Sequence, residues 1–576
     1  MRVVVVEAPK KVHTLEKILG SDFMVLATGG HIKDLPPDKL AVDVADNFAV
    51  EYSLLPRKES VVVQLNKAKS YDVLICTDAD REGERIGAHV ANILGIPLTK
   101  AARVTYGNLS PATVLTALKS PRQFDMNLLD AQEARRVVDR LMGYLISKWL
   151  WKMGDIMQTR LKAAGRVQSA VLNLIVKREE TIKTFVPVTH YLLKLKKMAD
   201  LLNKDAMEGI QVQKVNDKFE EVRYSSLLDI NLALEEFKSR AEPLKLYSKT
   251  EKVDTVFPPP ALITSSLIKQ ASTLFGYAPE KIMTVAQALY ADGRISYIRT
   301  DNPNVSGEFV DMAKAWFKSK SADGIMGDSI KTFKAPEGAQ EAHEAIRPTD
   351  LGFNYEGLAQ DQRNVYELIL IRALLSVCAP AKLNKEVSIF ECGKLFFRFN
   401  GIKIEQLGWH TFGDLFPQFK PLFCKLFTPP KAISITDDLS GLVPLQYPIT
   451  SQCPPRYTVA TLTEEMEKLE IGRPSTYVAV FVTLDRHKYI QYTKQKSIEP
   501  TLEGQQAIKM LRVAFAPFIE ADYTKKVEAE LDDIAAGRLS KETFLNLWYH
   551  DFVGFYDKAM DTVSQMLASR PTVPTA

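Results

Sequence analysis

The stretch from Asp78 to Glu84 reads DADREGE and directly follows a short apolar run. Such a run is typical of a buried strand, so the acids that follow it gather at one edge of a sheet. Crowded carboxylates repel one another unless a divalent cation neutralises them, and Mg²⁺ prefers oxygen ligands. The sequence therefore predicts a magnesium site that contains Asp78, Asp80 and Glu82.

The valine run at residues 3–6 predicts a second strand, and it also ends in an acid, Glu7. If both strands belong to one parallel sheet, four carboxylates meet at the same edge. The heptapeptide has a second interpretation, a solvated helix start whose acids favour the positive end of the helix dipole. In sequence and placement the four acids resemble the Toprim module shared by type IA and type II topoisomerases, bacterial primases and some nucleases. This resemblance implies metal-assisted chemistry on nucleic-acid phosphates without choosing among these enzymes.

With 576 residues the chain exceeds a single core, and its length predicts about three to five domains. Its composition, 46% hydrophobic and 25% charged, is typical of a globular protein in water. No apolar run approaches the ~18 residues of a membrane span, and the first valine run is too short for a signal peptide. Five cysteines are scattered without a CxxC pair, as expected of reduced packing residues. We therefore expect a cytoplasmic, nucleoid-associated protein with no membrane contact.

The net charge of +4 is too small to indicate nucleic-acid binding, but the basic residues are unevenly placed. Residues 131–190 contain eleven Lys and Arg against five Asp and Glu. This local excess of positive charge suits a track for nucleic-acid phosphates. An ordinary solvated helix face has the same composition, so charge alone leaves both interpretations open.

The pattern of apolar residues predicts a multidomain protein with α/β, α and β parts. Strand-like and helix-like runs alternate first, which predicts a parallel sheet flanked by helices. Later, a helical block separates two β-rich stretches, so an inserted α domain interrupts a β-rich domain. The expected divisions are an α/β domain at 1–120, a helical domain at 121–187 and 445–576, a β-rich arch at 188–257 and 381–444, and a helical insert at 258–380. Part of residues 35–50 is expected to join the helical domain at 445–576.

The insert contains a candidate nucleophile in the segment GRISYIRTD, residues 293–301. A tyrosine can attack a phosphodiester to form a phosphotyrosine, and a nearby cation stabilises the charge that builds on the phosphoryl oxygens. In an extended segment residues two apart project to the same side, so Tyr297 and Arg299 address one phosphate together. The alternative is an ordinary half-buried tyrosine without a chemical role.

Ordered motifs along most of the chain resemble those of type IA DNA topoisomerases. ISYIRTD matches the family's active-site tyrosine motif. The other matching segments are GHIKDLP (30–36), FDMNLLDAQEARRVVDRLMGY (124–144), GRVQS (165–169), AQEAHEAIRPT (339–349), PRYTVATL (455–462) and IGRPSTY (471–477). GHIKDLP and IGRPSTY are more similar to the topoisomerase I branch than to the topoisomerase III branch. We expect a core of that branch without C-terminal zinc ribbons, since no four-cysteine motif precedes Ala576.

The resemblance implies a toroidal gate and a reaction that needs no ATP. One DNA strand is cut through a 5′-phosphotyrosine, another strand passes through the gate, and the cut is rejoined, which relaxes negative supercoils. The lack of a GxxxxGK[ST] phosphate loop agrees with a reaction that uses no nucleotide cofactor. The expected partners are single-stranded and negatively supercoiled DNA, and the enzyme is expected to be monomeric.

The resemblance also implies roles for individual residues around Tyr297, the nucleophile. Arg299 stabilises the phosphoryl transition state, and Lys11 donates to the scissile phosphate. His343 orients a partner, either Asp301 or the phosphate itself.

The acids have two expected roles in the family's reaction. Glu7 is the candidate general acid for the departing 3′-oxygen, because a carboxyl among other carboxylates has a raised pKa. Mg²⁺ is needed chiefly to rejoin the strand, and its expected ligands are Asp78, Asp80, Glu82 and Glu7. The residues expected to bind the single strand are His31, Arg135, Arg136, Asp139, Arg140, Tyr144, Arg166, Gln168, Ser169, Arg473, Ser475 and Thr476.

Two other functions remain open from the sequence. The missing ribbons also suit a decatenase of the topoisomerase III kind. A noncatalytic protein that binds single-stranded DNA and keeps an inactive site is the alternative from a different class, and it predicts no covalent adduct with DNA.

Overall fold

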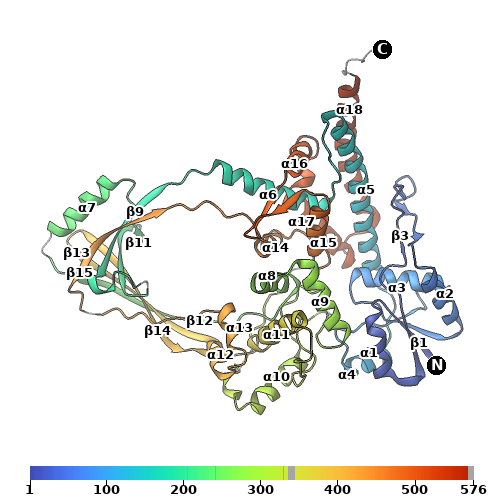
Figure 1. Ribbon diagram of the computed structural model, residues 1–576, viewed down its shortest axis with the longest axis horizontal. Helices are drawn as coiled ribbons and strands as arrows, with labels where there is room; N and C mark the ends of the chain where they lie inside the picture. The colour runs from blue at the N-terminus through green and yellow to red at the C-terminus, as the bar shows by residue number, and fades with distance from the viewer. Residues whose placement is uncertain (204, 240–241, 328–329, 335–343, 437, 569–576) are drawn as a thin grey trace.

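The computed structural model describes residues 1–203, 205–239, 242–327, 330–334, 344–436 and 438–568. An α/β part with the N-terminus lies at one end of the molecule, and an antiparallel sheet lies at the other (Figure 1). Helices lie between these two ends, and two arms of the chain connect them to the sheet, so the elements are arranged in a ring. Within the described ranges, no helix is both long enough and apolar enough to cross a bilayer.

The α/β part contains a four-stranded parallel sheet with the strand order β2-β1-β7-β8. Its elements are β1 (Arg2–Val6), β2 (Phe23–Ala27), β7 (Asp72–Ile75), β8 (Ala102–Arg103), α1 (Lys10–Leu19), α2 (Glu59–Lys67), α3 (Arg81–Leu94) and α4 (Pro111–Lys119). Side chains alternate across a strand, so Val3 and Val5 pack with α2 and α3, whereas Val4 and Val6 pack with α1 and α4. The predicted parallel sheet covered on both faces is confirmed.

Two small hairpins extend from the α/β part. In them β3 (Lys33–Asp34) pairs with β6 (Ser53–Leu54), and β4 (Val42–Asp43) pairs with β5 (Ala49–Val50). Their apolar residues Leu35, Val42 and Phe48 belong to the core of the helical part. The ring of Phe48 lies 5.8 Å, edge to face, from that of Tyr549. The hairpins therefore tie the α/β part to the helices.

The helical part combines two stretches that are far apart in the sequence. Its elements are α5 (Met126–Met157), α6 (Arg166–Thr184), α14 (Val459–Lys468), α15 (Tyr477–Arg486), α16 (Leu502–Ala514), α17 (Ala521–Ala535), α18 (Lys541–Ala568) and the hairpin of β16 (Ile490–Tyr492) with β17 (Ile498–Pro500). Helices α17 and α18 both pack against α5, and α18 lies alongside it in Figure 1. One hydrophobic core therefore joins the two stretches.

The large sheet is antiparallel, with the order β12-β13-β14-β10-β9-β15 and β11 paired with β10. Its strands are β9 (Thr189–Lys197), β10 (Glu208–Val215), β11 (Lys218–Glu221), β12 (Lys245–Val256), β13 (Ala381–Cys392), β14 (Leu395–Gln406) and β15 (Leu442–Thr450). Val256, which ends β12, is the register partner of Ala381, which begins β13. The chain therefore leaves the sheet and returns to it at neighbouring strand ends, and the predicted helical insertion is observed.

The insert is seated on the α/β part. Its helices are α8 (Thr264–Phe275), α9 (Pro279–Ala291), α10 (Gly307–Ser319) and α11 (Gln360–Leu375). Thr14 of α1 donates a hydrogen bond from its hydroxyl to the carbonyl oxygen of Ala291 at 2.9 Å. On its other side, α8 packs against α14 of the helical part.

The β-rich stretches also contain helices that alternation of apolar residues does not predict. These are α7 (Leu227–Ser239), α12 (Phe412–Leu415) and α13 (Lys420–Leu426). Ala233 and Leu234 of α7 pack into the core of the sheet, so this helix covers a sheet face. Short 3-10 helices occur at Gly20–Asp22, Ala68–Ser70, Met198–Asp200, Asp323–Ile325, Gly408–Thr411 and Ala516–Ile519.

A buried acid joins the α/β part to the start of α5. Glu84, the last residue of DADREGE, is 1% exposed and accepts hydrogen bonds from Arg103 at 2.8 Å and Arg122 at 2.9 Å. It also accepts one from the backbone N–H of Asp125 at 2.8 Å. The motif therefore ends in a structural acid, and Arg103 beside it is fully buried.

We expect Glu84→Ala to lower the free energy of unfolding by about 3–5 kcal/mol, because it leaves the buried Arg103 guanidinium without its counter-charge. Urea unfolding followed by circular dichroism measures the change. Glu16→Ala on the exposed face of α1 is the matched control and should change stability little. A loss no larger than the control's would contradict the structural role of Glu84.

Candidate active site

Tyr297 lies between α9 and α10, where the insert meets the α/β part. Its backbone N–H donates to the carbonyl oxygen of Gly107 at 2.9 Å. The hydroxyl of the preceding Ser296 donates to the carbonyl oxygen of Ala345 at 2.8 Å. The Tyr297 side chain is 3% exposed, and its hydroxyl donates to Oδ2 of Asp80 at 2.6 Å. Segments from two parts of the chain thus hold the tyrosine beside the first turn of α3.

Asp80 connects this tyrosine to the helix that follows β7. It is the N-cap of α3, and its Oδ1 accepts a hydrogen bond from the backbone N–H of Gly83 at 2.7 Å. The other oxygen, Oδ2, faces Tyr297 and lies 3.6 Å from Nη1 of Arg299. The Asp80 carboxylate therefore caps α3, orients the phenol of Tyr297 and contacts the guanidinium of Arg299.

Burial and the charges of Asp80 and Asp78 raise the pKa of Tyr297 well above its usual value, while Arg299 opposes them. The phenol is therefore neutral near pH 7 and donates a hydrogen bond. To act as a nucleophile it must pass its proton to an acceptor.

Lys11 lies in the same buried layer and is 0% exposed. Its ammonium donates to Asp78 and to the hydroxyl of Tyr290, the latter at 3.2 Å. Although burial disfavours the charge, Asp78 raises the pKa of Lys11 above its ordinary value, so the ammonium persists. The rings of Tyr290 and Tyr297 lie 5.3 Å apart, edge to face. The lysine thus links an acid to the packing behind the candidate nucleophile.

Glu7 directly follows β1 and lies in the same charged layer. Burial, followed by repulsion from Asp78 and Asp80, raises the pKa of Glu7 to about 7. At neutral pH a large fraction of this carboxyl therefore carries a proton that it can donate.

Glu82 is held away from the tyrosine. Its Oε2 lies 3.0 Å from Nε2 of His31 and accepts a hydrogen bond from the side-chain amide of Gln132 at 3.1 Å. Burial works against its charge, but His31 and further hydrogen bonds lower the pKa of Glu82 to about 2. This acid is therefore ionised and joins the loop of GHIKDLP to α5.

In the described part of the chain, the four expected carboxylates do not form a ready-made metal site. Among the described residues, no three His, Cys, Asp or Glu side chains lie close enough together to hold a metal ion. Asp78 faces Lys11, Asp80 faces Tyr297, and Glu82 faces His31, so each is neutralised or hydrogen-bonded separately. All four still supply the oxygen ligands that a hard divalent cation prefers, and two of them raise the pKa of Glu7. The donor chemistry fits such a cation, although this arrangement is not assembled around one.

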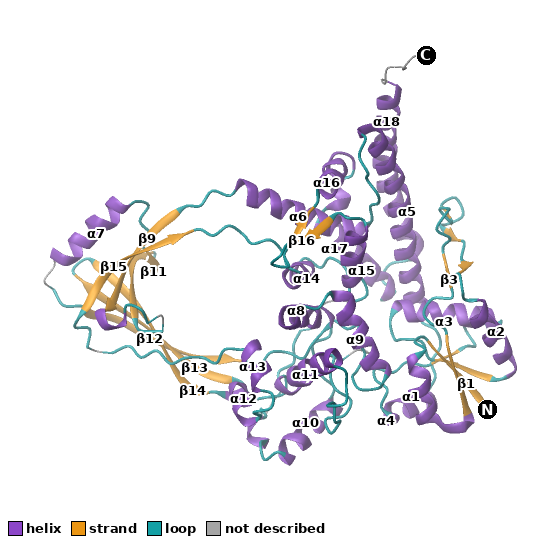
Figure 2. Cartoon of the chain, in the orientation of Figure 1, coloured by secondary structure: helices purple, strands orange, loops and turns teal. Residues whose placement is uncertain are grey.

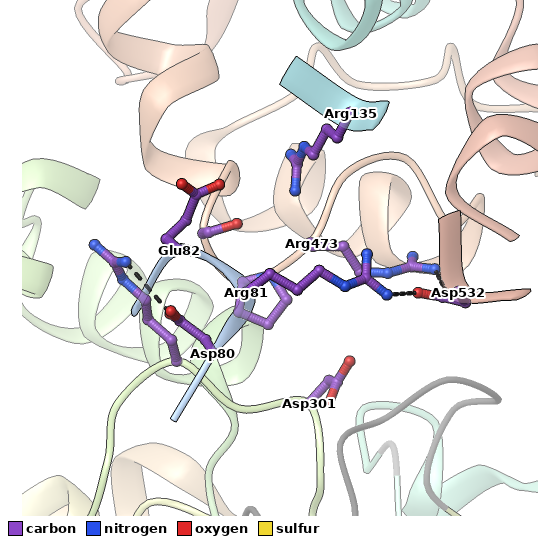
Figure 3. A pocket seen from close by; sticks show the side chains of 10 residues that line it. Asp80, Arg81, Glu82, Arg135, Asp301, Arg473 and Asp532 are labelled. Atoms are coloured by element: carbon purple, nitrogen blue, oxygen red, sulfur yellow. Dashed lines mark hydrogen bonds and ion pairs between the residues drawn. The ribbon is translucent and has the colours of Figure 1, made fainter. Parts of the chain in front are cut away.

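Two adjoining pockets lie in front of these side chains. Figure 3 shows the first, between the start of α3, residue 301 and the loop before α15. Glu82, Arg135, Arg299 and Ser475 line both pockets. The predicted site residues that line one or both are Glu7, His31, Asp80, Glu82, Arg135, Arg136, Asp139, Arg299, Asp301, Arg473, Ser475 and Thr476. The structure therefore brings together residues from six of the separate motifs.

Two predicted strand-binding residues of α5 contact the first hairpin instead of lining these pockets. Arg140 donates to the carbonyl oxygen of Pro36 at 2.6 Å, and the Tyr144 hydroxyl donates to the carbonyl oxygen of Asp38 at 3.4 Å. Arg136, which does line a pocket, holds Asp34 through both of that residue's carboxylate oxygens at 2.7 Å. These contacts fix the hairpin against α5.

The predicted residues of GRVQS lie at the buried start of α6. Arg166 is 2% exposed and pairs with Asp139 at 2.9 Å and with Glu528 at 2.8 Å. Ser169 is buried and accepts a hydrogen bond from the motif's glycine at 3.3 Å, and Gln168 lies alongside the same glycine. Arg166 therefore positions Asp139, which lines the second pocket, whereas Ser169 bonds within its own motif.

Sequence reasoning missed several residues of the site. Arg81 and Asp532 line the first pocket, and Tyr290 contacts both Lys11 and Tyr297. Arg81 lies inside DADREGE, so that motif could have identified it. Asp532 lies on α17 and belongs to no recognised motif. His343, predicted to orient a partner of the tyrosine, lies outside the described residues.

Comparisons with known proteins agree with this geometry. Residues 123–546 match a family model described as DNA topoisomerase, and residues 2–108 match the Toprim domain. The chain belongs to the bacterial type IA DNA topoisomerases. The family, the multidomain fold class and the enzyme class predicted from the sequence are confirmed.

Relatives of this topoisomerase include two bacterial enzymes. It is 31% identical to DNA topoisomerase 1 of Campylobacter jejuni, over 99% of this chain and 80% of that protein. It is 31% identical to DNA topoisomerase 1 of Vibrio cholerae, over 95% of this chain and 65% of that protein. The solved structure of full-length topoisomerase I from Thermotoga maritima superposes with a TM-score of 0.80 at 29% identity, covering 96% of this chain and 90% of that one.

Membership of this family makes the protein an isomerase that acts on DNA by cutting, passing and rejoining strands. Its Toprim domain is of a kind that generally binds divalent metal. The two parts that meet at Tyr297 are thus the Toprim domain and the insert of a topoisomerase.

The turn that carries the acids leaves no room for a side chain at Gly83. A Cβ there would lie 2.1 Å from the carbonyl oxygen of Asp78. We expect Gly83→Ala to displace Asp78 and Asp80 and to reduce plasmid relaxation at least about tenfold, as misplaced reacting groups do. Gly307→Ala, at the start of α10, is the control because nothing lies within 4 Å of its added Cβ. Equal activities of the two variants would show that the turn tolerates the methyl group.

Proposed function

We propose that Tyr297 is the nucleophile that cuts one DNA strand and keeps the 5′-phosphate as a phosphotyrosine. The observation that carries this proposal is the hydrogen bond from its hydroxyl to Asp80, made across the contact between the insert and the Toprim domain. In the cutting step the phenol oxygen bonds to phosphorus and the 3′-oxygen leaves. Asp80 is the carboxylate placed to accept the phenol proton, and Arg299 stabilises the developing phosphoryl charge.

The departing 3′-oxygen needs a proton, and we assign its donor as Glu7. The raised pKa of this carboxyl, about 7, supports a general acid at neutral pH. Lys11 remains charged beside Asp78 and is proposed to donate to the scissile phosphate. His343 is proposed to orient Asp301 or the phosphate, and Asp301 lines both the first pocket and a third one beside Tyr477.

The metal proposed for this Toprim domain is Mg²⁺. Asp78, Asp80 and Glu82, with Glu7, are the residues that would hold it, and its charge would offset the phosphate and the acids while the strand is rejoined. The hydrogen bonds that now hold each acid separately are the contacts that would rearrange.

The domain divisions proposed for strand passage follow the four parts of the fold. Residues 1–120 form the Toprim domain, 121–187 with 445–576 the strand-binding domain, 188–257 with 381–444 the arch, and 258–380 the insert. In this proposal the strand-binding residues that line the two pockets form the approach to Tyr297, and the insert moves on the arch to open the gate. The enzyme relaxes negative supercoils as a monomer, without a nucleotide cofactor, on nucleoid DNA in the cytoplasm.

Tyr297→Phe tests the nucleophile. We expect it to abolish both the covalent adduct with single-stranded DNA and plasmid relaxation, because the attacking oxygen is missing. Denaturing gels of end-labelled oligonucleotides measure the adduct. Tyr106→Phe, which changes a buried tyrosine of the Toprim domain, controls for loss of a hydroxyl. Relaxation by Tyr297→Phe would refute the mechanism.

Removal of Mg²⁺ tests the division between cutting and rejoining. With a chelator present, we expect the adduct on single-stranded DNA to form while plasmid relaxation stops, since the ion acts chiefly in rejoining. Added Mg²⁺ should restore relaxation in the same sample. If relaxation continues at the same rate in the chelator, the assignment of the four acids as metal ligands is wrong.

A further inference from the structure

Two arginines from different domains share one carboxylate in the first pocket. Arg81 begins α3, and its Nη2 donates to Oδ1 of Asp532 on α17. Arg473, in the loop before α15, donates from Nη2 to Oδ2 of the same residue at 2.6 Å. Figure 3 shows the two guanidinium groups next to each other beside this carboxylate. Both of its oxygens are therefore used by cations.

The position of this pair favours an anion. Arg81 occupies the first turn of a 14-residue helix, where backbone N–H groups and the helix dipole attract negative charge. Asp80 and Arg299 line the same pocket, and Asp80 holds Tyr297. An anion bound between the two arginines would therefore lie next to the candidate nucleophile, Tyr297.

Asp532 is more exposed to solvent than Glu528, another acid of α17, although both contact Arg473. Glu528, one turn earlier, is 0% exposed, and so is the side chain of its partner Arg166. At Asp532 the side chains are partly open to solvent, at 14% for Arg81, 10% for Asp532 and 22% for Arg473. A solute can therefore reach Asp532 and its two arginines, but it cannot reach the pair of Glu528 and Arg166.

A guanidinium binds carboxylate and phosphate through the same two parallel hydrogen bonds. When a phosphate replaces the carboxylate, each arginine keeps an anionic partner, so neither guanidinium is left uncompensated. A phosphodiester therefore matches the hydrogen-bonding pattern that the Asp532 carboxylate satisfies now.

We propose that Arg81 and Arg473 form a binding subsite for a phosphate of the DNA strand, and that Asp532 fills this subsite when DNA is absent. The inference rests on the proposed function in one respect, namely that the strand runs past Tyr297. Asp532 then weakens DNA binding, because each incoming phosphate must displace it.

The test is Asp532→Asn, which keeps the shape of the side chain and removes its charge. We expect the variant to bind a fluorescein-labelled single-stranded oligonucleotide about tenfold more tightly at about 50 mM salt, because no acid competes for the arginines. The slope of log Kd against log salt should steepen by about 0.7, the contribution of one further phosphate contact. If Asp532 only positions the two arginines, the variant binds no more tightly than the unmodified enzyme, and this result would overturn the proposal.

A double-mutant cycle with Arg81 assigns the effect to this pocket. Arg81→Gln should weaken binding about tenfold, and the gain from Asp532→Asn should disappear in the double variant. A gain that persists in full without Arg81 would also overturn the proposal. Asp533→Asn is the matched control, because the neighbouring acid pairs with Arg538 and is 42% exposed. It should leave the affinity unchanged.

Two further measurements keep the outcomes distinct. Asp532→Glu retains the competing charge. We therefore expect its thermal unfolding temperature and its affinity for the oligonucleotide to be close to those of the unmodified enzyme. A tenfold gain in affinity in this variant would contradict competition by charge. The covalent adduct with DNA is measured in parallel. If the unmodified enzyme forms no adduct, the proposed function fails, whereas an adduct without a gain in Asp532→Asn defeats only the phosphate subsite.

Discussion

The hydrogen bond between Tyr297 and Asp80 is the interaction on which the organisation of this molecule depends. It joins a loop of the insert to the cap of a helix in the Toprim domain, and it is accompanied by the backbone contact from Tyr297 to Gly107. Because it is made between parts rather than within one, the candidate nucleophile is complete only while the two parts touch. Burial of the phenol and of Lys11 behind it makes this contact sensitive to any separation of the insert from the sheet edge.

Charge is balanced in pairs throughout the site. Lys11 offsets Asp78, His31 supports Glu82, and Arg81 with Arg473 offset Asp532. Each pair is made of residues from different elements, so the electrostatic balance also holds the elements together. A buried charge that loses its partner is costly, and an arrangement of this kind therefore changes by exchange of partners and not by their simple loss.

The sequence alone predicted the parallel sheet, the inserted helices and the family, because these features depend on periodicity and on short local motifs. It placed Tyr297, Asp80 and Arg299 in one site through their motifs, and the structure brings them together. It did not predict that Glu82 turns toward His31 or that Arg166 is enclosed by Asp139 and Glu528, since side-chain partners depend on tertiary packing. Asp532 was missed for the same reason. Helix α7 was missed because alternation of apolar residues indicated only strands in its region.

The attachment of the insert to the arch has a further consequence. The insert begins and ends at Val256 and Ala381, which are register partners on adjacent antiparallel strands. The two strands are hydrogen-bonded neighbours in one antiparallel ladder, so this ladder holds the two ends of the insert side by side. In the proposed gate motion, the two ends of the insert would therefore move together. The alignment that a broken DNA backbone needs for rejoining would then depend on the β12–β13 ladder, which is remote in sequence from the catalytic residues.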